Sequence, residues 1–138
     1  TLSDEDRQKA LIREKAAAFL QFMLPGSPCI YYGDEAGEEG FEDPFNRRFF
    51  PWGREERSLT EFYKKLASLK NTNEALRFGV AKVSSPEDGT VVIRRSANGK
   101  TLCAALSLKG GFTVSGKIIF SNAKGGALPE NGFALYEE

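Results

Sequence analysis

Side chains that could contact a ligand are concentrated between residues 34 and 52. The acids are Asp34, Glu35, Glu38, Glu39, Glu42 and Asp43, and the other members are Arg47, Arg48, Phe41, Phe45, Phe49, Phe50 and Trp52. Carboxylates and guanidinium groups hydrogen-bond pairs of hydroxyl groups, and aromatic rings cover the apolar faces of a sugar, so this set suits a polyhydroxylated ligand. The same composition fits a solvated acidic loop whose arginines pair with its acids, and composition alone favours that interpretation.

A catalytic pair is not predicted within this loop. Asp34 and Glu35 are adjacent, and adjacent residues leaving a strand point to opposite sides, whereas the two carboxylates of a retaining glycosidase flank one bond at roughly 5–5.5 Å. Histidine is absent from the chain, which excludes histidine-based nucleophile pairs and histidine-ligated zinc within it. Cys-rich metal spacing is also missing, so neither a metal site nor a cofactor is predicted.

The segment before the loop is predicted to be a buried strand over residues 29–32. Cys29, Ile30, Tyr31 and Tyr32 are strand formers without alternation, as expected of a strand covered on both faces. Gly33 then ends the strand, and ligands bind beyond the carboxyl ends of such strands in alternating α/β folds. Tyr31, Tyr32 and Trp52 are therefore interpreted as core residues in preference to sugar platforms.

Helices are predicted on both sides of this strand and loop. A capping box at residues 3–6 begins a helix that runs to Leu24, where Pro25 and Gly26 end it. A second capping box at residues 58–61 begins a helix that ends at Asn71–Asn73. The second half of the first helix is apolar on nearly every side, so it is predicted to enter a core.

The second half of the chain is predicted to form an antiparallel sandwich that begins near Leu76. Strand-like segments occupy residues 90–94, 101–108, 117–120 and 133–136. Glycine pairs separate them, and Asp88-Gly89 and Asn98-Gly99 are hairpin signals. No dinucleotide or phosphate-binding motif is present in the glycine-rich stretches.

Composition limits the classes of partner. The formal net charge of the 138 residues is zero, so no broad field favours nucleic acid or an anionic membrane, and no apolar run approaches the ~20 residues of a bilayer span. Cys29 and Cys103 lie in apolar segments and are interpreted as buried free thiols, which favours a reducing, cytoplasmic location. A single disulfide between them stays open as the alternative.

Residues 24–35, with Asp43-Pro44-Phe45-Asn46-Arg47 and Trp52 after them, resemble the alpha-amylase family of glycoside hydrolases. Within it they are most similar to the neopullulanase, cyclomaltodextrinase and maltogenic amylase group. The resemblance implies an α+β chain: residues 1–75 would be the last helix-strand-helix portion of a TIM barrel, including its eighth strand. Residues 76–138 would be the C-terminal antiparallel β-sandwich domain.

The resemblance also implies a function. The chain would be the C-terminal fragment of a retaining glycosidase that acts on alpha-glucans or maltooligosaccharides. The catalytic carboxylates of the family lie on earlier barrel strands, so this chain would have no catalytic residue and would be inactive alone. A non-catalytic carbohydrate-binding or interaction module is the alternative.

The resemblance carries substrate-binding roles onto three residues. Asp43 and Arg47 match the family's binders of the glucose unit at the far donor-side subsite, with a structural ion pair as the other interpretation. Glu35 would support the loop or touch substrate. Apolar faces of the barrel portion, at Phe19, Phe22, Met23, Ile30 and Tyr31, are expected to pack onto the sandwich, onto each other or across a homodimer.

Overall fold

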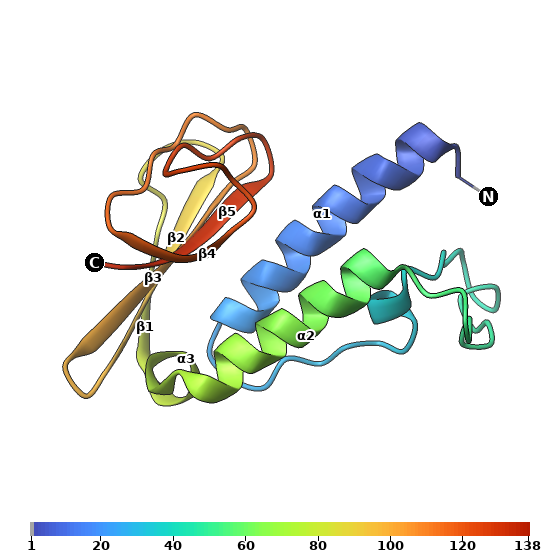
Figure 1. Cartoon of the computed structure of the whole chain (residues 1–138), viewed down its shortest axis with the longest axis horizontal. Helices are drawn as coiled ribbons and strands as arrows, with labels where there is room; N and C mark the ends of the chain where they lie inside the picture. Colours follow the sequence, from blue (N-terminus) through green and yellow to red (C-terminus); the bar gives the residue numbers. More distant parts are fainter. Residues whose placement is uncertain (1) are drawn as a thin grey trace.

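The chain consists of two long helices packed against one antiparallel sheet (Figure 1). The computed structural model describes residues 2–138. Helices α1 (Asp4–Met23) and α2 (Arg57–Thr72) lie side by side and run in the same direction, because the intervening segment returns beside α2 through the 3-10 helix η1 (Asp34–Ala36) (Figure 1). A short helix, α3 (Glu74–Phe78), then leads into the strands.

All five strands belong to one sheet with the order β1-β2-β3-β5-β4. They are β1 (Val80–Ser84), β2 (Thr90–Ala97), β3 (Lys100–Ser107), β4 (Lys117–Ser121) and β5 (Gly132–Glu137). The four strand-like segments of the sequence are confirmed, and β1 was not predicted. The hairpin at Asn98-Gly99 is also confirmed: Ala97 pairs with Lys100, and both turn residues have the positive φ of a type I′ turn, 52° and 75°.

The expected sandwich is wrong in one respect, because a single sheet takes the place of two. The strand β3 shows why. Leu102, Ala104 and Leu106 belong to the core shared with the helices, while Cys103 and Ala105 belong to a second cluster on the opposite face. Loop residues, including the buried Val114 and Leu128, and not a second sheet, complete that second cluster. A run of apolar residues without alternation therefore marks a strand covered on both faces.

The helix ends follow capping chemistry, with one correction. The side chain of Ser3 accepts a hydrogen bond from the Asp6 N–H at 3.1 Å, as the first capping box predicts. Helix α2 begins one residue earlier than its predicted box, at Arg57, because the carboxylate of Glu56 accepts from the Ser58 N–H at 3.3 Å. Among residues 2–138, no helix is long and apolar enough to span a bilayer.

The predicted strand over residues 29–32 is not formed in this structure. These residues pair with no strand in the described chain, and Ile30, Tyr31 and Tyr32 are 39%, 53% and 46% exposed. A strand forms only where its backbone groups pair with a neighbouring strand, and the five strands of the antiparallel sheet pair with one another and not with this segment. The segment is fixed instead by local contacts, such as the Gln21 amide donating to the Cys29 carbonyl at 2.9 Å.

The two cysteines differ in burial, because Cys103 lies in a central strand whereas Cys29 lies in the segment that forms no strand. Both are free thiols; Cys103 is buried in β3 as predicted, whereas Cys29 is exposed, which corrects its predicted burial. The apolar face of α1 behaves as expected of a helix that enters a core. Phe19, Phe22 and Met23 are buried, and the ring of Phe19 stacks on Phe133 of β5 with centroids 4.4 Å apart.

Two buried cations bind the carboxyl end of α1. The ammonium of Lys70 donates to the Leu24 carbonyl at 2.6 Å, and the guanidinium of Arg95 donates to the Met23 carbonyl at 2.7 Å. Burial lowers the pKa of Lys70, and the nearby charge of Arg95 lowers it further. A helix end carries unpaired carbonyls and partial negative charge, so cations at this point compensate both.

We predict that Lys70→Met lowers the free energy of unfolding by about 1–2 kcal/mol, because it removes the charged donor from the part-buried hydrogen bond to the Leu24 carbonyl. Chemical denaturation measures the change. Lys64→Met is the matched control on the exposed side of α2, where the ion pair with Glu61 contributes less than about 1 kcal/mol. An equal effect of the two substitutions would contradict the anchoring role of Lys70.

Candidate functional site

The candidate site is the loop between η1 and α2, and η1 fixes its first end. Gly33 and Gly37 flank η1 with positive φ values of 100° and 68°. The carboxylate of Glu35 accepts from the Gly33 N–H at 3.0 Å, and its backbone carbonyl accepts from the Thr60 hydroxyl at 2.8 Å. These contacts make Glu35 a support of the loop, and its contact with substrate stays a prediction.

Arg7 of α1 ties the loop to the helices. Its guanidinium donates to the Gly37 carbonyl at 3.4 Å and pairs with Glu39 at 3.4 Å and with Glu56 at 3.9 Å. The loop therefore depends on a residue 30 positions earlier in the chain. This contact was not predicted from the sequence, because spacing within a helix carries no signal of a partner in a distant loop.

Asp43 and Arg47 are brought together as a bidentate pair. The Nε of Arg47 lies 2.7 Å from Oδ1 of Asp43, and its Nη2 donates to Oδ2 at 3.3 Å. The side chain of Arg47 is 67% exposed and that of Asp43 is 60% exposed. The four-residue spacing thus produces a planar pair at the surface, with guanidinium N–H groups and carboxylate lone pairs left over for a ligand. No contact within residues 2–138 joins Glu35 to this pair.

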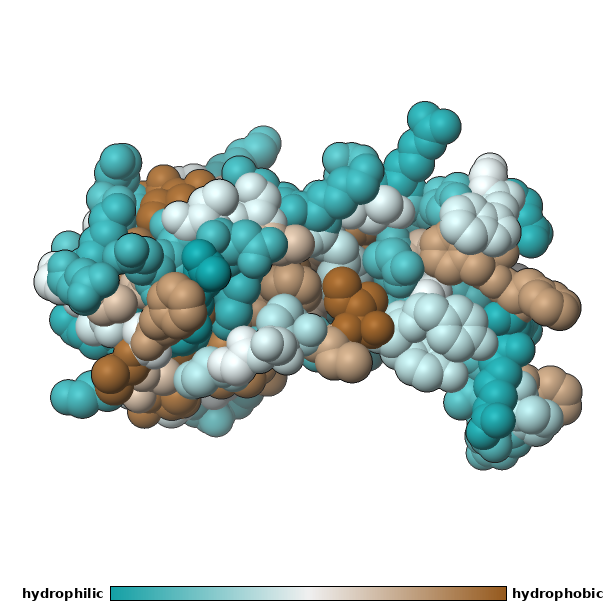
Figure 2. Space-filling model, turned by 90° about the horizontal axis from the view of Figure 1, so that it is seen from below, coloured by the Kyte–Doolittle hydropathy of each residue, from teal (hydrophilic) through white to brown (hydrophobic). Residues whose placement is uncertain are grey.

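The same loop also carries exposed aromatic side chains, and rings project from this end of the molecule in the space-filling view (Figure 2). Phe49 and Trp52 are 98% and 80% exposed, so the interpretation of Trp52, Tyr31 and Tyr32 as core residues is wrong. Without partner strands on either side of the tyrosines, there is no core at this position for their rings to enter. The guanidinium of Arg48 lies over the Phe41 ring at 5.3 Å and pairs with Glu38 at 3.3 Å. The pairing of loop arginines with loop acids that composition favoured is therefore present.

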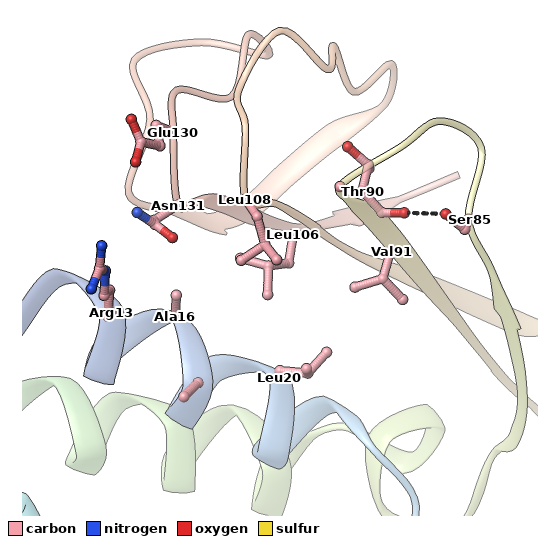
Figure 3. A pocket seen from close by; sticks show the side chains of 12 residues that line it. Arg13, Ala16, Leu20, Ser85, Thr90, Val91, Leu106, Leu108, Glu130 and Asn131 are labelled. Atoms are coloured by element: carbon pink, nitrogen blue, oxygen red, sulfur yellow. Dashed lines mark hydrogen bonds between the residues drawn. The ribbon is translucent and has the colours of Figure 1, made fainter.

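A small cavity lies within the loop, and a larger one lies elsewhere, between α1 and the sheet. A cavity of about 160 Å³ lies within the loop, lined by residues that include Tyr32, Asp34 and Arg48 but none of the three predicted site residues. Burial raises the pKa of Asp34 there. A larger cavity of about 660 Å³ separates α1 from one end of the sheet, where Leu20 faces Leu106 across an apolar gap (Figure 3).

Known proteins resemble the chain over most of its length. The amylopullulanase of Thermoanaerobacter thermohydrosulfuricus is 46% identical over 99 residues, which are 71% of this chain and 7% of that protein. The cyclomaltodextrinase of Thermoanaerobacter pseudethanolicus is 37% identical over 97 residues, 69% of this chain and 17% of that protein. No protein-family model matches the chain.

Solved structures agree with these relatives. The maltogenic amylase of S. marinus superposes with a TM-score of 0.78 at 34% identity, over 92% of this chain and 19% of that structure. This chain belongs to the alpha-amylase family and matches a C-terminal portion of its members. The cyclic alpha-maltosyl-(1→6)-maltose hydrolase of Arthrobacter globiformis gives the same TM-score at 26% identity, over 91% of this chain and 30% of that one. The chain thus spans less than a third of each of these alpha-amylase-family proteins.

We predict that Arg7→Gln loosens the loop without unfolding the chain, because it removes the one side chain that bonds Gly37, Glu39 and Glu56 together. Limited trypsin digestion measures this as faster cleavage after Arg47 and Arg48. The control is Lys9→Gln, whose only ion pair is with Glu5 on the exposed side of α1. Equal cleavage rates in the two variants would show that the contacts of Arg7 do not hold the loop against the helices.

Proposed function

We propose that this chain is the C-terminal part of an alpha-amylase-family glycosidase that hydrolyses alpha-glucans or maltooligosaccharides with retention, and that it carries none of the reacting carboxylates. The observation that carries the proposal is the match to the maltogenic amylase of S. marinus, which takes in 92% of this chain but only 19% of that structure. Most of such an enzyme would then lie outside these 138 residues, in keeping with the absence of a paired-carboxylate arrangement from the loop.

The parallel course of α1 and α2 supports the barrel part of this proposal. In a β/α barrel, successive helices run in the same direction because a strand returns the chain between them. Residues 24–33 make that return here beside α2 (Figure 1). We therefore propose that residues 1–75 complete a barrel, with residues 29–32 as its last strand once neighbouring strands supply hydrogen-bond partners. Residues 76–138 would be the C-terminal domain.

The glucan contact is assigned to Asp43 and Arg47, with Glu35 supporting the loop from below. An exposed bidentate pair presents fixed donors and acceptors to adjacent hydroxyl groups of one sugar, at little cost in side-chain entropy. The exposed rings of Tyr31, Tyr32 and Phe49 would contact the rest of the enzyme or the sugar. A homodimer through these faces and a cytoplasmic location are part of the same proposal.

A complete carbohydrate-binding module is the second candidate, and the exposure of Phe45, Phe49 and Trp52 favours it. Such rings are platforms on which a stand-alone module stacks sugars. The two candidates differ in what the 138-residue chain does by itself: the module binds maltooligosaccharide with no further partner, whereas the fragment holds an incomplete site.

We predict that the purified chain neither hydrolyses maltotriose nor releases heat of binding with it at millimolar concentration. Product chromatography and titration calorimetry measure the two properties. Binding that Arg47→Gln abolishes would favour the module. Hydrolysis above the background rate would overturn the assignment of the reacting carboxylates to other parts of the enzyme.

We also predict an effect of Asp43→Asn in a chimera in which this chain replaces the matching segment of the Thermoanaerobacter pseudethanolicus cyclomaltodextrinase. Losing a charged hydrogen bond to substrate should lower kcat/KM for cyclomaltodextrin by roughly tenfold or more. Glu42→Gln, an exposed neighbour, is the control and should change kcat/KM by less than about twofold. An active chimera indifferent to Asp43→Asn would refute the assigned contact.

A further inference from the structure

An acidic cleft of about 350 Å³ lies between α1, α2 and η1, apart from the glucan-binding pair. Its polar lining consists of Glu14 and Gln21 from α1, Asp34 and Glu38 from the η1 region, and Tyr63 from α2. Three carboxylates, an amide and a phenol thus face one space, and no basic side chain lines it. Asp43 and Arg47 do not reach this cleft.

Tyr63 is the second feature of this cleft. Only 7% of the residue is exposed, and its ring packs edge-on against Phe22 with centroids 6.2 Å apart. Its hydroxyl has no hydrogen-bond partner among residues 2–138 and is accessible from the cleft, since the Nε of Arg95 is the one buried side-chain N or O atom without a partner in the described residues. Tyr63 lines the cleft together with Glu14 and Asp34. Burial raises the pKa of Tyr63, and the charges of Glu14, Asp34 and Glu35 raise it further.

The surrounding cations compensate only part of this negative charge: Arg48 pairs with Glu38 at 3.3 Å, but no ion pair in the described residues engages Glu14 or Asp34. Arg7 is engaged by Gly37, Glu39 and Glu56, and Lys15 donates to the Ser58 hydroxyl at 3.2 Å. Burial, and then the charge of Asp34, raises the pKa of Glu14 to about 7, against smaller opposing effects of Arg7 and Lys15. A carboxylate that is difficult to ionise beside a second carboxylate is stabilised by a cation placed between them.

We propose that this cleft binds one guanidinium or primary ammonium group, carried either by a small molecule or by an arginine or lysine side chain. The cation donates to the carboxylates of Glu14 and Asp34, and the Tyr63 oxygen accepts a further N–H. An organic cation fits better than a metal ion, because no group of three acidic, Cys or His side chains within residues 2–138 lies close enough to hold a metal. A neutral sugar would leave the paired charges uncompensated.

Two probes test the proposal on the 138-residue chain: agmatine as the free cation, and N-acetyl-arginine-N-methylamide as the side chain of a polypeptide. Carbon-detected NMR follows the titration of the Glu14 carboxyl. A bound cation favours the ionised carboxylate, so the midpoint should fall from about 7 toward ordinary Glu values. Sodium chloride at equal ionic strength controls for screening, which should produce a smaller fall.

Two variants assign the binding to this cleft. Calorimetric affinity should weaken by about tenfold in Glu14→Gln, which removes the charge, and by about threefold in Tyr63→Phe, which removes only the hydroxyl. Glu61→Gln, an exposed carboxylate on α2, should leave affinity unchanged. Binding of either probe with this pattern supports the proposal, and the tighter probe identifies the source of the cation. A midpoint shift no larger than that with sodium chloride, or affinity indifferent to both Glu14→Gln and Tyr63→Phe, overturns it.

Discussion

The carboxyl end of α1 is the point on which the rest of the structure depends. Helix α1 has no basic residue in its last turn, and the cations that bind its final carbonyls come from other elements. Arg95 of β2 donates to the carbonyls of both Met23 and Gly79, at 2.7 and 3.1 Å, and Lys70 of α2 donates to that of Leu24. Two cations thereby join α1, α2, the sheet and the turn after α3 at one position. The cost is visible in the buried Nε of Arg95, which has no partner in the described residues.

This junction makes the helices and the sheet a single core. The ring of Phe19 stacks on Phe133, and buried residues of α1, α2, α3 and the central strands form one continuous cluster. The segment from Leu24 to Trp52 lies outside that core. Arg7 and Thr60 hold this segment at the carbonyls of Gly37 and Glu35, while the tyrosines and Phe49 remain exposed. The chain therefore combines one continuous core with a segment whose aromatic rings are exposed.

Local chemistry allowed much of this to be predicted from the sequence. The Ser3 cap, the Asn98-Gly99 hairpin and the strands around Cys103 and Phe133 depend on neighbours within a few residues, so their patterns are readable. The pairing of Asp43 with Arg47 follows from a four-residue spacing in the same way. Residues 29–32 do not form the predicted strand in this structure, because a run of strand formers becomes a strand only when partner strands are present, and periodicity does not report partners. The sheet strand β1 was missed for the opposite reason: pairing with β2 forms it despite a weak apolar pattern.

Some features lie beyond any reading of local pattern. Lys70, Arg95 and Arg7 each bond a backbone group at least 16 residues away, and the approach of Glu14 to Asp34 and Tyr63 joins three elements. Such contacts arise from packing, so only coordinates reveal them. The similarity to alpha-amylase-family enzymes and the exposed tyrosine segment agree with our proposal. In it, the core of helices and sheet folds by itself, and residues 29–32 form a strand only when neighbouring strands supply hydrogen-bond partners.

Amide hydrogen exchange across the whole chain tests this account most directly. It predicts that amides in α1 and in β3 and β5 exchange together, at the rate set by global unfolding, while those of residues 29–32 exchange nearly as fast as unprotected amides. Slow exchange of residues 29–32 at the rate of β3 would show that the segment is already a fixed part of the fold and would contradict the account. Exchange of α1 separately from the sheet would contradict the single core.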